Sequence, residues 1–115
     1  MSYQLQLEQL LDKSEILSME NQEEFIDRYN EFMTLGNDFL SIRMPVSASE
    51  AFYGAGLSAA VMYIAYCEEI YSGKAVKALE RFCELTDNTS PEKIENAKDM
   101  ILAIKKTCLV NYMGK

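Results

Sequence analysis

The stretch that decides the fold is EAFYGAGLSAAVMYIAYC, residues 50–67. After Glu50, seventeen consecutive residues carry no charge, and many of them are small. Such a run could cross a membrane, fill the centre of a helical bundle, or meet another chain. A membrane span fits poorly, because the run is short for a bilayer, is rich in Ala, Gly and Ser, and is flanked by acids rather than by Lys or Arg. We therefore expect a helix that is covered by protein and has no contact with a membrane.

The helix around this stretch is predicted over residues 48–72. Ser47-Ala-Ser-Glu50 resembles a capping box, and Ser72-Gly73 is typical of a helix end. At 100° per residue the helix has two unequal faces. A broad, bulky face predicts core positions: Phe52, Tyr53, Gly56, Leu57, Ala60, Tyr63, Ile64, Cys67, Ile70 and Tyr71.

The second face of the same helix is apolar but thin. Its candidate self-association residues are Gly54, Ser58, Val61, Met62 and Ala65, with Ala55 beside them. Left in water, such a face would be an unusual apolar patch for a monomer. Two interpretations stay open: the rest of this chain covers the face, or the same helix of a second molecule does. We favour the second, a homodimer, because a self-complementary patch is sufficient for one.

The rest of the chain also shows helical periodicity. We expect helices over 2–17, 22–42, 74–86 and 91–112 in addition to 48–72. Asn21 and Glu24 resemble a capping box, Pro45 marks a stop, and Pro91 suits a first helical turn. No stretch alternates long enough to predict a strand. Short connections favour antiparallel neighbours, so the prediction is an all-α, single-domain antiparallel bundle of four to five helices over residues 1–115, with the apolar helix at its centre.

Charge is distributed unevenly along the chain. The net charge is −7, made up of −9 over residues 1–69 and +2 over residues 70–115. An acidic front half argues against direct nucleic-acid binding, which needs a concentrated basic face.

The three cysteines, Cys67, Cys83 and Cys108, form no CxxC pair and fall at apolar positions. Together with an N-terminus that lacks the features of a signal peptide, they predict a reducing, cytoplasmic location.

The composition excludes several chemistries. Because the chain contains no histidine, it lacks the commonest general base and the Ser-His and Cys-His nucleophile pairs. It has no phosphate-binding loop and no EF-hand loop. Glu-x-x-Glu and Glu-x-x-Asp pairs occur, but their order along the chain does not fit the magnesium site of all-α nucleotide pyrophosphatases. We therefore predict no enzyme activity, no catalytic residues, no metal site and no cofactor, and a metal-dependent all-α nucleotide hydrolase is the third alternative for function.

One pattern of acids supports a sharper hypothesis. On the helix predicted over 22–42, acids recur beside the aromatic face. The candidate acidic partner face consists of Glu20, Glu23, Glu24, Asp27, Glu31 and Asp38. Such a row is usually a solvated surface or pairs with lysines of the same fold, but it could also dock on a basic protein. The predicted function is a non-enzymatic protein–protein interaction module for an unidentified partner: an adaptor, regulator or assembly subunit that self-associates. The alternative is a small acidic inhibitor or immunity-type protein that blocks a basic or nucleic-acid-binding target.

Overall fold

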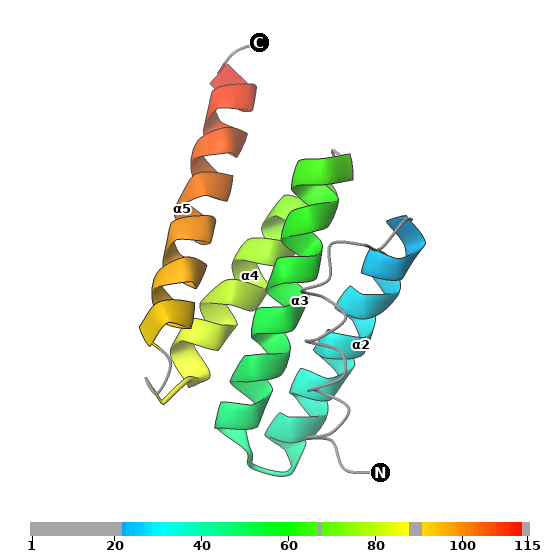
Figure 1. The fold of residues 1–115 in the computed structure, drawn as a ribbon, viewed down its shortest axis with the longest axis vertical. Helices are drawn as coiled ribbons and strands as arrows, with labels where there is room; N and C mark the ends of the chain where they lie inside the picture. Colours follow the sequence, from blue (N-terminus) through cyan, green and yellow to red (C-terminus); the bar gives the residue numbers. More distant parts are fainter. Residues whose placement is uncertain (1–21, 67, 88–90, 114–115) are drawn as a thin grey trace.

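The chain folds into a bundle of antiparallel helices (Figure 1). A computed structural model describes residues 22–66, 68–87 and 91–113. Within these ranges the helices are α2 (Gln22–Ser41), α3 (Pro45–Tyr66), α4 (Ile70–Leu85) and α5 (Pro91–Met113), and no strand occurs. The predicted all-α bundle is thus confirmed, whereas the helix predicted over 2–17 lies outside the described residues.

The order of the helices in space follows their order in the sequence. α3 lies between α2 and α4, and α5 packs along the side of α4 (Figure 1). The molecule is elongated, with extents of 48 × 30 × 23 Å. The helix that contains the opening stretch is therefore central, as predicted.

α3 is buried on almost every side, which explains its lack of a polar face. Every residue from Ala51 to Gly56 is buried. Between Ala48 and Tyr63, the residues that reach solvent in part are Glu50, Leu57 and Val61. Their spacing places them on one narrow stripe of the helix. Leu57, predicted to be core, and Val61 of the second face thus lie together on the open stripe.

The predicted bounds of the central helix were wrong at both ends. α3 begins at Pro45 rather than at residue 48, since proline suits the first helical position and needs no capping box. α3 ends at Tyr66 rather than at residue 72, and Gly73 lies inside α4, which begins at Ile70 rather than at residue 74. Glu69, the residue directly before α4, has ordinary right-handed helical dihedral angles (φ −57°, ψ −33°). Gly73 was therefore a misleading end signal.

The end of α2 uses a residue that the sequence did not single out. Arg43 adopts the left-handed conformation (φ 60°) that glycine usually supplies. The Met44 N–H donates to the Phe39 carbonyl at 2.9 Å, and the Arg43 N–H donates to the Leu40 carbonyl at 3.1 Å. These two bonds form a Schellman motif, which satisfies carbonyl groups at the end of the helix. α2 ends at Ser41, within one residue of the prediction.

Candidate interaction surfaces

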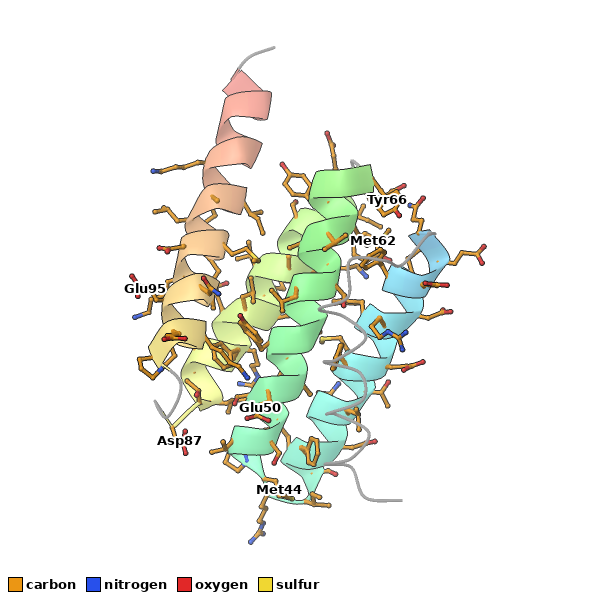
Figure 2. All side chains as sticks on the ribbon, viewed as in Figure 1. Met44, Glu50, Met62, Tyr66, Asp87 and Glu95 are labelled. Atoms are coloured by element: carbon orange, nitrogen blue, oxygen red, sulfur yellow. The ribbon has the colours of Figure 1, made fainter. Side chains whose placement is uncertain are left out.

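The candidate self-association residues lie mostly inside the molecule. Gly54, Ser58 and Met62 are buried, and the ring of Phe32 in α2 lies directly against Gly54. Val61 is half-buried on the open stripe of α3, and the side chain of Ala65 lies outside the described residues. Figure 2 shows Met62 on α3 at the side that faces α2. At Gly54 the covering side chain thus comes from the same chain, and a homodimer, which stays a prediction, needs another surface.

The candidate acidic partner face is open to solvent along most of its length. Glu23, Glu24, Asp27 and Glu31 are exposed and Asp38 is half-buried, while Glu20 lies outside the described residues. The Arg28 guanidinium lies 3.8 Å from the Glu31 carboxylate. Such a local pair on a surface contributes little to stability. Because Arg28 is the single basic residue of α2, the face keeps its acidic character.

An apolar tip, which the sequence analysis did not identify, lies at the turn between α2 and α3. It consists of Ile42, Met44 and Val46, with exposed fractions of 50%, 41% and 37%. Figure 2 places Met44 at this end of the bundle. The sequence Ile42-Arg-Met-Pro-Val46 does contain a signal for this tip, because three large apolar residues occur where the residues of a turn are normally polar.

A groove between α4 and α5 forms a second surface that the sequence analysis missed. It has a volume of about 370 Å³ and is shallow and largely open to solvent. Five of its lining residues come from α4 and two from α5: Ser72, Gly73, Val76, Lys77, Glu80, Ile104 and Lys105. Its lining is mostly apolar, with charged groups among the lining residues. Periodicity alone could not find it, because it depends on how α5 packs on α4.

Aromatic side chains of α2 and α4 contact each other beside α3. The rings of Tyr29 and Tyr71 meet edge to face with centroids 5.8 Å apart. The Lys74 ammonium lies 5.4 Å from the centroid of each ring. Burial raises the pKa of Tyr29, and Tyr71 raises it further. The Gln22 side-chain amide also donates to the Glu68 carboxylate at 2.8 Å. These contacts hold the fold together and leave the two rings buried.

The described residues contain no cluster of side chains that could hold a metal ion. In residues 22–66, 68–87 and 91–113, no three or more Cys, Asp or Glu side chains come together as a metal ion would require. Burial raises the pKa of the half-buried Cys83 thiol, and the opposing effect of Lys98 is smaller. A raised pKa leaves less of the thiolate that acts as nucleophile. Over the same part of the chain, no helix is both long and apolar enough to cross a membrane.

Comparison with known proteins adds no relative. No protein-family model matches this sequence, and neither the curated proteins nor the solved structures contain a match. The inference about function therefore depends on the surfaces of this chain alone.

Proposed function

We propose that this chain acts by binding another protein and that the apolar tip is its main contact. The observation that carries the proposal is the exposure of Ile42, Met44 and Val46 within five consecutive residues. Exposed apolar side chains that are grouped mark interaction sites more often than scattered ones do. The arrangement supports a non-enzymatic adaptor, regulator or assembly subunit, and the free Cys83 thiol is compatible with the proposed cytoplasmic location.

The experiment compares the tip with a single exposed apolar residue elsewhere. The triple substitution Ile42→Ser, Met44→Ser and Val46→Ser removes the apolar tip at positions that are already exposed. Leu102→Ser, at a site on α5 that is 52% exposed, is the matched control. Tagged protein is cross-linked in its source cells and its partners are identified by mass spectrometry. The triple variant should lose a partner that the control keeps, and a partner retained by both variants would contradict the proposal.

The same variants test self-association. If the partner is a second copy, light scattering should give a dimer for the parent chain and for Leu102→Ser, and a monomer for the triple variant. A parent chain that is monomeric at tens of micromolar would remove the homodimer and leave a different protein as partner.

A second function is supported by the exposed acidic face of α2. An exposed row of carboxylates on a helix whose single basic residue is Arg28 can dock on a basic protein, as an inhibitor of a nucleic-acid-binding target would. Asp27 and Glu23 are both exposed acids on this helix. Charge reversal at Glu24, Asp27 and Glu31 should abolish capture of a basic target and leave the melting temperature nearly unchanged. Capture that persists after charge reversal, or that does not weaken with added salt, would exclude the acidic face.

A further inference from the structure

Gly73 differs from the other described glycines of the bundle in having no packing reason. A Cβ atom added at Gly36, Gly54 or Gly56 would lie 2.5–2.7 Å from a side-chain atom of a neighbouring helix. A Cβ atom added at Gly73 would meet nothing within 4 Å. Gly73 is not in the left-handed region either, and it lies inside α4. Glycine inside a helix costs about 1 kcal/mol relative to alanine. In the described structure, no close packing contact explains why this position is glycine.

The position of Gly73 connects it to the α4–α5 groove. Gly73 and Ser72 belong to the lining, together with the apolar side chains of Val76 and Ile104. Ile70, one turn before Gly73, is the most exposed large apolar residue that the structure describes, with an exposed fraction of 68%. The prediction that it belongs to the core was wrong, because Ile70 begins α4 and does not continue the central helix. An added side chain at Gly73 would project into open space beside the groove. The absence of a side chain at Gly73 keeps the backbone of α4 accessible to a ligand in the groove.

The shape of the groove favours a helix over a small molecule. Small-molecule sites usually enclose most of the ligand surface, whereas this groove is largely open to solvent. An amphipathic helix can lay its apolar stripe into such a groove and remain solvated on its other face. A residue without a side chain lets the backbones of two helices approach closely.

The charges around the groove indicate the chemistry of that helix. Lys77 and Lys105 line it and are exposed, and Glu80 is the one acid among the lining residues. Lys106 follows Lys105 on α5 and is also exposed. Opposite charges steer a partner and fix its orientation. We propose that the α4–α5 groove binds an amphipathic α-helix of another protein, with Asp and Glu residues flanking its apolar stripe. This site is separate from the apolar tip, which lies at the other end of α3, and it does not depend on the function proposed for the tip.

The test uses a displayed library of helical peptides with randomised surface positions, selected on the full-length chain. The selected peptides should be acidic and amphipathic. Their affinity should fall at least about tenfold for Gly73→Leu, which fills the space beside the groove. Leucine is a better helix former than glycine, so this variant should be more stable than the parent chain while it binds less. Loss of binding through unfolding is thereby excluded. Gly73→Ala is the matched control, because it gains helix propensity and adds only one methyl group.

Charge and surface specificity are tested with two further variants. The double substitution Lys77→Glu and Lys105→Glu should weaken the same peptides, and the triple tip variant should bind them as the parent chain does. The proposal is overturned if no helical peptide is enriched, if the enriched peptides are basic or uncharged, or if Gly73→Leu leaves their affinity unchanged. It is also overturned if Gly73→Leu converts a dimeric parent chain into a monomer, since the occupant would then be a second copy.

Discussion

Phe32 of α2 packs so closely against Gly54 of α3 that a Cβ atom at Gly54 would lie 2.6 Å from Cζ of the ring. The reverse contact occurs further along the same pair of helices, where Phe52 of α3 lies against Gly36 of α2 and the corresponding distance is 2.7 Å. Each helix thus supplies one glycine and one phenylalanine to the seam. Both rings are almost completely buried, so neither has room to move away from an added methyl group.

Alanine at Gly54 should therefore destabilise the fold. We expect Gly54→Ala to lower the free energy of unfolding by about 1–3 kcal/mol through overpacking, against a smaller gain from helix propensity. Urea denaturation measures the change. Gly73→Ala is the matched control: it makes the same substitution in a helix where the added Cβ is free of contact, and it should raise the free energy of unfolding by about 1 kcal/mol. A shift of the same sign in both variants would contradict the packing role of Gly54.

The sequence predicts α2 and α5 well because their ends carry local signals. Pro91 begins α5 as expected, and the stop before Pro45 places the end of α2 within one residue. The start of α4 has no such signal, because Glu69, the residue before it, adopts a right-handed conformation that most residues can adopt. Gly73, three residues inside α4, instead imitates a helix end.

The surfaces are harder to predict than the helices. A small-residue face on α3 is a local pattern, but which group covers it depends on tertiary packing. Phe32 lies in α2 and Gly54 lies in α3, so the turn between the two helices separates them in the sequence. No local pattern indicates that the ring of Phe32 covers Gly54. The acidic face of α2 was predictable because charge and helical spacing together determine it. The apolar tip and the α4–α5 groove could be identified only once the arrangement of the helices was known.

The Schellman turn at Arg43 leads to a prediction about stability. A residue with a Cβ atom in the left-handed conformation costs about 1–2 kcal/mol relative to glycine. Because the Arg43 side chain is exposed, its removal should cost little packing energy. Arg43→Gly should raise the free energy of unfolding by about 1 kcal/mol, less the entropy that glycine adds to the unfolded chain. Thermal denaturation tests this. Ile42→Gly, one residue earlier, should not stabilise, and a gain of equal size there would argue against the conformational explanation.

The two buried serines of α3 should respond oppositely to alanine. The Ser49 hydroxyl donates to the Val46 carbonyl at 2.6 Å, whereas the Ser58 hydroxyl finds no hydrogen-bond partner in the described structure. Burying a hydroxyl without a partner costs about 1–3 kcal/mol. Ser58→Ala should therefore raise the free energy of unfolding by about 1 kcal/mol, with a further small gain from helix propensity. Ser49→Ala, which removes a hydrogen bond that is made, should be neutral or destabilising. Denaturant titration of both variants decides the matter, and destabilisation by Ser58→Ala would indicate a partner for this hydroxyl.

Stability at alkaline pH should depend on Tyr29. Burial, and then Tyr71, raise the pKa of Tyr29 above its ordinary value of 10, so the fold favours the neutral phenol. This contribution is fully present below the pKa of the unfolded chain and is lost as the pH rises through the higher pKa of the folded state. Phenylalanine keeps the ring contact and cannot ionise. Tyr29→Phe should therefore lose less stability than the parent chain between about pH 9 and pH 11. If the curves of stability against pH for Tyr29→Phe and the parent chain run parallel, Tyr29 does not control the alkaline limit of the fold.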